Sequence, residues 1–415
     1  MTSPLTSSVG SPRRAIVISF DRLPLGYLGC YGNDWIETPH LDRLATQSVL
    51  FDLHFGENFC TQAKNHAWWT GTPQHPLDEA AQSRQPALVQ LLNNARLATV
   101  LLAETTATDP PAHSPPFTKI VPVTGADAPD VPANEHPFSR LIVEATRCVT
   151  EFQLSPAPWL IWLQSRGVPQ PCHPPTELHD LYDDEFELVA DEESAPPDDG
   201  LPISKPNADR DDSDHDSDLF RWRSEVAAYV SFIDECLGHL LKFLDDSGLA
   251  DQTLVIVTAA AGDSHGLLTE SLVHTPLIVR DPTGDIPGSR CHELVQPTDI
   301  FPTLLKWFDL PAAESSSDQS QFTGHSLLPW THSESANRTM RECLHLGYGR
   351  QQQAIRTHEH YLICDSEALA SADPTSTASH VQLFEKPHDH WDRLDLSREY
   401  PAIVEQLLKL ANRTS

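Results

Sequence analysis

The chain has 415 residues, of which 39% are hydrophobic, so it is long enough to bury a sizeable core in one or two domains. Its formal net charge of −31 excludes nucleic acid as a partner, because a protein that binds backbone phosphates needs clustered Lys and Arg. No apolar run reaches the roughly 18 residues of a membrane span, and no signal-peptide pattern is evident, so we expect a cytoplasmic protein without a membrane partner.

Short apolar segments alternate with amphipathic ones, which predicts an α/β fold with parallel strands. The first apolar segment, Ala15–Phe20, has the composition of a buried strand and ends directly before Asp21. Ligand sites in open α/β sheets lie at such strand ends. Thr38 and Pro39 then predict the start of a helix over His40–Val49. The later predicted elements are a helix and a strand within Leu88–Leu102, strands over Trp159–Leu163 and Thr253–Thr258, and a helix over Phe220–Leu244.

Composition divides the chain into a flexible N-terminus at 1–12, an α/β domain at 13–332 and a C-terminal subdomain at 333–415. The stretch 177–218 is rich in Asp, Glu, Pro and Ser, and we expect a disordered insertion there, because too few apolar residues are present to offset the ordering entropy. Its Asp run lacks the Gly and the terminal Glu of an EF-hand, which disfavours a calcium loop.

The C-terminal subdomain contains strand-like segments and an amphipathic closing helix. The strands are expected at Ala354–Arg356 and His360–Ile363, and the helix at Pro401–Ala411. A His-rich segment, Pro387–Asp392, lies between them, and its position predicts a solvated turn rather than a metal site.

Several segments together resemble the sulfatase family of alkaline-phosphatase-like hydrolases. The opening AIVISFDRLPLGYLGCYGNDWIETPHLDRLA is similar to the family's first strand, its L-G-C-Y-G and its T-P-x-L-D-x-L-A. HTPLIVRDP, PTDIFPTLL and LFEKPHDHWDRLDL resemble later phrases of the family in the same order. The resemblance implies a large mixed α/β sheet sandwiched by helices, followed by a small C-terminal α+β subdomain with an antiparallel sheet and a helix.

The resemblance also implies a site for one divalent cation, calcium or magnesium, at the ends of two strands. Asp21 falls on the first of the family's paired acids, but the second position is Arg22. The pair of ligands after the later strand falls on Ala260 and Ala261, whose side chains cannot coordinate a metal. We therefore expect metal binding to be weak or absent.

A relocated pair of ligands is the alternative for this metal site. If the loop after the later strand carries a small insertion, Asp263 and His265 take the places of the lost ligands. His265 also falls near the family's sulfate-binding lysine, where a neutral imidazole would hold an anion less well than an ammonium group.

The nucleophile segment reads NFCTQAKNHAWWTG and lacks the family's C-x-P-S-R, so no formylglycine is expected. Aligned on Thr70 and Gly71, the nucleophile position is Thr61, and Asn65 stands where the family has an arginine. Threonine is the nucleophile in phosphodiesterase relatives, but it needs a metal to activate it. The structural alternative is that Thr61 is a helix N-cap. Lys64 is a candidate anion-binding group, with surface solvation as its alternative.

Three functions follow from these residues. The first is a catalytically impaired sulfatase-family protein that keeps a cleft for a small anionic ester. The second is an active sulfate or phosphate ester hydrolase that uses Thr61 with Asp21, Asp263 and His265. The third is an acidic scaffold whose insertion binds a basic protein partner, which the sequence does not identify.

Overall fold

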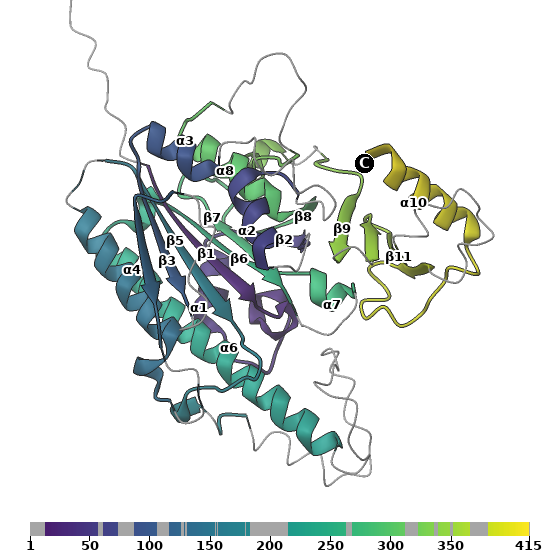
Figure 1. Ribbon diagram of the computed structural model, residues 1–415, viewed down its shortest axis with the longest axis horizontal. Coiled ribbons are helices and arrows are strands. Elements are labelled where there is room, and N and C mark those ends of the chain that lie inside the picture. Colours follow the sequence, from purple (N-terminus) through teal and green to yellow (C-terminus); the bar gives the residue numbers. More distant parts are fainter. Residues whose placement is uncertain are drawn as a thin grey trace, which may run out of the picture.

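The protein is described from a computed structural model, which places residues 13–56, 61–73, 87–105, 116–125, 128, 131–153, 155, 157–178, 180–182, 215–262, 268–311, 323–335, 339–348, 352–365 and 381–414. Within these ranges, 61–64, 215–220, 348 and 411–414 are described by their backbone alone. A large sheet covered by helices adjoins a smaller sheet that carries the C-terminal helix (Figure 1). None of the described helices is both long and apolar enough to cross a membrane.

The large sheet has eight strands in the order β4-β3-β5-β1-β6-β7-β2-β8. Strand β7 is antiparallel to both of its neighbours, and the other pairings are parallel, so the sheet is mixed. The strands are β1 (Arg14–Arg22), β2 (Val49–His54), β3 (Ala98–Glu104), β4 (Lys119–Val123), β5 (Trp159–Gly167), β6 (Thr253–Ala261), β7 (Leu277–Arg280) and β8 (Ser289–Val295).

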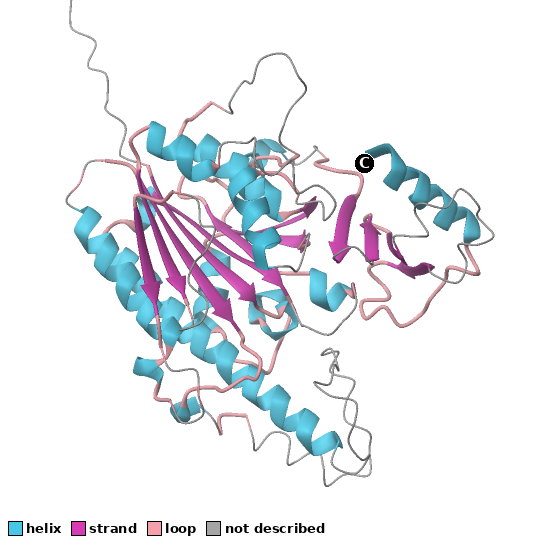
Figure 2. Cartoon of the chain, in the orientation of Figure 1, coloured by secondary structure: helices cyan, strands magenta, loops and turns pink. Residues whose placement is uncertain are grey.

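Helices cover both faces of this sheet, as Figure 2 shows. Helices α1, α4 and α6 share one hydrophobic core with the sheet, and α2, α3 and α8 share the other. The α-helices are α1 (Pro39–Thr46), α2 (Thr61–Thr70), α3 (Leu88–Asn94), α4 (Pro137–Gln153), α6 (His215–Asp246), α7 (Glu270–Val273), α8 (Ile300–Trp307) and α10 (Pro401–Thr414). Short 3₁₀ helices lie at Leu25–Tyr27, Gly29–Tyr31, Ala133–Glu135, Thr176–Leu178, Ala250–Gln252, Pro297–Asp299, Leu328–Thr331 and Ser333–Ser335.

The central strand β1 is buried because both of its faces meet helices. Ile16, Ile18 and Phe20 belong to the core beneath α1, α4 and α6, whereas Ala15 and Val17 belong to the core beneath α2, α3 and α8. Successive side chains of a strand point to opposite faces of the sheet. Therefore the residue after Phe20 is presented to the α2 face.

The small sheet is antiparallel, with the order β12-β11-β10-β9. One of its faces packs against α10, and the other packs against Phe55, Leu268 and Val273 of the larger unit. The strands are β9 (Leu344–Tyr348), β10 (Gln352–Arg356), β11 (His360–Asp365) and β12 (Val381–Glu385). The predicted fold class, a large mixed sheet between helices and a small antiparallel sheet with a helix, is confirmed.

Two predicted element boundaries differ from the structure. The helix expected over His40–Val49 ends at Thr46, because Val49 already begins β2. Tyr182 lies within the stretch expected to be a disordered insertion, yet it is buried. Its ring meets Trp35 edge-on at 5.4 Å, and its hydroxyl lies 2.8 Å from Ser231 Oγ. Residues 183–214 lie outside the described residues.

Candidate functional site

The carboxyl ends of β5, β1 and β6 lie side by side at one edge of the large sheet. Arg22 is paired with Gly167 on β5 and with Ala261 on β6. One residue earlier, Asp21 therefore lies level with Arg166 on one side and Ala260 on the other. This is the edge at which open α/β sheets bind ligands.

Helix α2 brings its first turn to the same edge. Asn65 Oδ1 accepts a hydrogen bond of 3.3 Å from Gln164 Nε2 near the end of β5. Thr61 is the first residue of α2, so its backbone lies one turn before Asn65, at the positive end of the helix dipole. Thr61 is the first helical residue, and because the side chains of Thr61 and Lys64 lie outside the described part of the structure, the roles of N-cap, nucleophile and anion-binding group stay predictions.

Glu104, at the end of β3, is a member of this site that the sequence did not reveal. Its Oε2 accepts hydrogen bonds from Ser165 Oγ at 2.8 Å and from the backbone N–H of Arg166 at 3.1 Å. Burial raises the pKa of Glu104 to about 7, and the negative charge of Asp21 adds to this effect, while the two hydrogen bonds oppose it. The signal that was available is an acidic residue directly after a buried apolar run, which is the pattern that singled out Asp21.

The described residues at this edge do not fit calcium or magnesium. These cations take about six or more oxygen ligands from carboxylates, carbonyls and water. The side chains of Ala260 and Ala261 are methyl groups, the carbonyl oxygen of Ala261 accepts the backbone N–H of Leu23, and one oxygen of Glu104 is already occupied by Ser165 and Arg166. Across the described ranges, no group of three or more His, Cys, Asp or Glu side chains is arranged to hold a metal ion.

The other residues proposed from the sequence fall outside this description. Asp263 and His265 lie outside the described residues, so their relocation toward Asp21 stays a prediction. The acidic stretch at 183–214 also lies outside the described residues, so its role in binding a basic partner stays a prediction.

A buried ionic cluster lies near this edge and joins the two sheets. Glu270 of α7 pairs with Lys386 and, at 3.4 Å, with Arg356 Nη2 of β10. Lys386 Nζ also lies 2.6 Å from Asp392 Oδ1, and Asp392 Oδ2 accepts the backbone N–H of Glu270. Burial raises the pKa of Glu270, but the charges of Arg356 and Lys386 outweigh it, so the net shift is downward.

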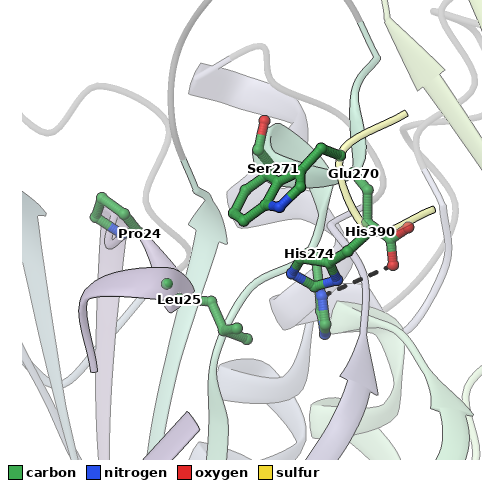
Figure 3. Close-up of a pocket in the computed structure, with 8 residues that line it drawn as sticks. Pro24, Leu25, Glu270, Ser271, His274 and His390 are labelled. Carbon is green, nitrogen blue, oxygen red and sulfur yellow. Dashed lines mark ion pairs between the residues drawn. The ribbon is translucent and has the colours of Figure 1, made fainter. Parts of the chain in front are cut away.

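The expected solvated turn over Pro387–Asp392 is present, since Pro387, His388 and His390 are exposed, but Asp392 departs from it. Only 3% of the Asp392 side chain is exposed, because it serves as a partner for Lys386 instead of facing solvent. His390 and Trp391 line a small cavity of about 30 Å³ together with His274 and Glu270 (Figure 3). The segment is therefore a structural connection between the two sheets as well as a turn.

Comparison with known proteins agrees with this architecture. The family model described as Sulfatase matches residues 13–310, which is most of the chain and contains every strand of the large sheet. The chain belongs to the sulfatase family. Asp21, Glu104, Ala260 and the start of α2 thus lie in the region that the sulfatase model covers.

Relatives with assigned names share only part of their length with this sulfatase-family chain. Arylsulfatase J of Mus musculus is 26% identical over 245 residues, which are 45% of this chain and 39% of that protein. The multifunctional alkaline phosphatase superfamily protein PehA of Trinickia caryophylli is 27% identical over 125 residues, which are 28% of this chain and 23% of that protein. The chain therefore matches less than half the length of either relative.

Solved structures of sulfatase-like proteins share the fold over nearly the whole chain. BT4656, determined in complex with its substrate D-glucosamine-2-N,6-O-disulfate, has a TM-score of 0.72 at 17% identity, with 97% of each chain covered. The phosphonate monoester hydrolase of Agrobacterium radiobacter has a TM-score of 0.71 at 16% identity, covering 97% of this chain and 96% of that one. At such low identity these likenesses establish the fold alone.

Proposed function

We propose that this sulfatase-family chain binds a small anionic ester at the carboxyl edge of its large sheet and is impaired in hydrolysing it. The proposal rests on the ends of β1 and β6, where Arg22, Ala260 and Ala261 follow or face Asp21, the one acid among the described residues of these two strand ends. The cytoplasm is the compartment we propose for the protein.

The chemistry of ester hydrolysis explains why these replacements matter. A hydroxyl nucleophile such as that of Thr61 is weak until a metal or a base lowers its pKa, and a metal also polarises the oxygens of the ester. A guanidinium group at position 22 balances the charge of an anionic ester, but it remains protonated and accepts no proton. The chain in this proposal therefore still binds the ester but does not activate the nucleophile.

An active hydrolase is the second candidate, and the position of Thr61 favours it. Its backbone begins α2 beside the end of β5, where the helix dipole favours an anion. The resemblance in fold to phosphonate monoester hydrolases makes phosphonate and phosphate esters suitable substrates for a test.

The deciding experiment is calorimetric titration of chelator-treated protein with calcium, magnesium, manganese and zinc. The same preparations are then assayed with an aryl sulfate, an aryl phosphate and an aryl phosphonate. We expect no stoichiometric metal binding and no turnover above the uncatalysed rate, together with saturable binding of the aryl sulfate.

Tight metal binding with turnover that disappears in Thr61→Ala would reject impairment and establish the hydrolase. Thr105→Ala is the matched control, because Thr105 follows β3 at the same edge and is not aligned with the nucleophile. A preparation that binds neither metal nor ester would reject both candidates.

A further inference from the structure

A second cavity lies at the opposite edge of the large sheet. Because β7 is antiparallel to β6, its last residue, Arg280, is paired with Val255 near the beginning of β6. The cavity there has a volume of about 280 Å³ and is enclosed by α1, the last turns of α6 and the end of β7. We call it the amino-edge cavity; its lining includes Arg43, Leu44, Gly238, His239, Lys242 and Arg280.

Arg280 is the unusual residue of this cavity. Only 6% of its surface is exposed, and neither its Nε nor its Nη2 has a hydrogen-bond partner among the described residues. Buried polar groups are nearly always hydrogen-bonded, and a buried charge without a partner costs stability. These two nitrogens are shielded from solvent, so Nη1 is the part of the guanidinium that is left to contact an oxygen of a carboxylate, a sulfate or a phosphate.

Glu235 and Asp245 also line the cavity, and Glu235 is exposed beside it. Asp245 Oδ2 lies 3.1 Å from Arg43 Nη2, and Asp246 Oδ2 lies 2.8 Å from Lys242 Nζ. No carboxylate of the described residues lies within 4.0 Å of Arg280. Burial lowers the pKa of Arg280, and the more distant charges of Asp245 and Asp251 oppose that shift. An arginine nevertheless stays protonated in proteins, so the charge persists.

The wall of the cavity contains a close contact between α1 and α6. His40 packs against Gly238 of α6, where a Cβ atom would lie 2.4 Å from the imidazole ring. Arg43, His239 and Lys242 are exposed at the rim, whereas Leu44, Gly238 and Arg280 are buried. Cationic side chains thus stand at the entrance and at the floor of the cavity, and the two at the entrance, Arg43 and Lys242, are paired with Asp245 and Asp246.

We propose that the amino-edge cavity binds a small oxyanion, with the guanidinium of Arg280 as its main ligand and Lys242 as a supporting charge at the rim. The oxyanion is a sulfate, a phosphate or a carboxylate, since all three present anionic oxygens to a guanidinium. This site is separate from the carboxyl edge and does not depend on the function proposed there.

If Arg280 instead only interacts with the ends of the neighbouring helices, the expected response of the protein to oxyanions is different. Helices α1 and α6 both end beside the cavity, and a cation near a helix C-terminus is stabilised by the helix dipole. If that were its whole role, oxyanions would stabilise the protein no more than chloride does. If it binds an oxyanion, ligand binding to the native state raises the stability in a saturable way.

The test is thermal denaturation and calorimetric titration of the full chain with sodium sulfate, phosphate or acetate, against sodium chloride at equal ionic strength. We expect saturable stabilisation by at least one oxyanion beyond that by chloride, and at least roughly tenfold weaker binding in Arg280→Met, which removes a charge-assisted contact. The three arms distinguish a tetrahedral ligand from a carboxylate.

Arg166→Met at the carboxyl edge is the matched control, and it is expected to keep this affinity. Loss of binding in Arg166→Met with retention in Arg280→Met would overturn the proposal and assign the oxyanion to the other edge. Equal effects of chloride and oxyanions would also overturn it. If Arg280→Met fails to fold, Lys242→Glu at the exposed rim is expected to weaken binding at least roughly threefold, and an unchanged affinity would reject the site.

Discussion

Glu104 sits at the edge of the large sheet with a pKa near neutrality, because burial penalises its charged form. Its hydrogen bonds from Ser165 and Arg166 recover only part of that cost. Asp21 lies close enough to raise the pKa of Glu104 further. The charge of the candidate site therefore changes within the range of ordinary assay buffers.

Replacing Glu104 by Gln tests this electrostatic cost. A carboxyl group whose pKa is raised on folding, here from 4.5 to about 7, stabilises the native state most below pH 4.5 and loses that contribution as the pH rises through 7. Gln mimics the protonated form at every pH. We expect Glu104→Gln to raise the free energy of unfolding by roughly 2 kcal/mol at about pH 8 and by much less at about pH 5.

Urea denaturation of both proteins at the two pH values measures this difference. Glu135→Gln is the control, because Glu135 is exposed and a substitution at the surface changes stability little. A stabilisation by Glu104→Gln that is the same at both pH values would contradict the assigned pKa.

The difference between Asp21 and Glu104 shows how far residue-level prediction reaches. Asp21 was predicted because it follows a strand-like run and matches a family motif. Glu104 follows a similar run, but an acid at a strand end is commonly solvated. The burial of Glu104 depends on Ser165 and Arg166 of another strand, and Ser165 is 61 residues away in the sequence. That partnership is a product of strand order, which a local pattern does not contain.

At the scale of elements, the contact between the ends of β1 and β5 depends on a glycine. Gly167 has a φ of 66°, and a Cβ atom added there would lie 1.8 Å from the carbonyl oxygen of Arg22. That oxygen also accepts the backbone N–H of Val168 at 3.0 Å. The close approach of the two strand ends therefore sets the position of Arg22 at the candidate site.

Gly167→Ala is expected to lower the free energy of unfolding by more than about 2 kcal/mol, because it combines a left-handed backbone with a steric clash. Gly248→Ala is the matched control: Gly248 has a φ of 67°, but nothing lies within 4 Å of the added Cβ. We expect it to cost only about 1 kcal/mol, the strain of the backbone alone. Equal losses in urea denaturation would show that the contact with Arg22 is unimportant.

The elements themselves were largely predictable, whereas the direction of one strand was not. The runs Ala15–Phe20, Trp159–Leu163 and Thr253–Thr258 became β1, β5 and β6 because buried parallel strands are continuously apolar. Leu277–Arg280 is equally apolar, but β7 runs antiparallel. Its direction follows from the path of the chain through α7, and this is why Arg280 lies at the amino edge of the sheet.

For the whole molecule, the cluster around Glu270 is the main polar connection described between the two sheets. Its four charged side chains come from α7, β10 and the segment after β12, and all of them are buried. Opposite charges buried together contribute little net stability, but removing one of them leaves an uncompensated charge. The cluster thus penalises any arrangement that separates the sheets.

Lys386→Met is expected to lower the free energy of unfolding by about 3 kcal/mol or more, since Glu270 and Asp392 lose a shared cation in a buried place. The control is Lys409→Met, which removes an exposed pair with Glu405 and is expected to change the free energy of unfolding little. Guanidinium denaturation measures both. A loss for Lys386→Met no larger than that of the control would mean that the buried charges are individually dispensable.

Sequence patterns could not have revealed this cluster. Glu270 is separated by 86 residues from Arg356 and by 122 from Asp392 in the chain. Local composition made Pro387–Asp392 look solvated, because His and Asp usually face water. Only the docking of the small sheet against Phe55 and Leu268 brings these charges into one buried place.

The separation of Glu270 from its partners also bears on how the protein is made. During synthesis, the nascent chain completes every strand of the large sheet before Arg356, Lys386 and Asp392 have emerged from the ribosome. Until then, the Glu270 carboxylate has neither of its cations and is kept hydrated rather than buried. The burial of Glu270 is therefore completed only when the small sheet docks, and a product truncated before residue 386 is expected to keep this carboxylate in water.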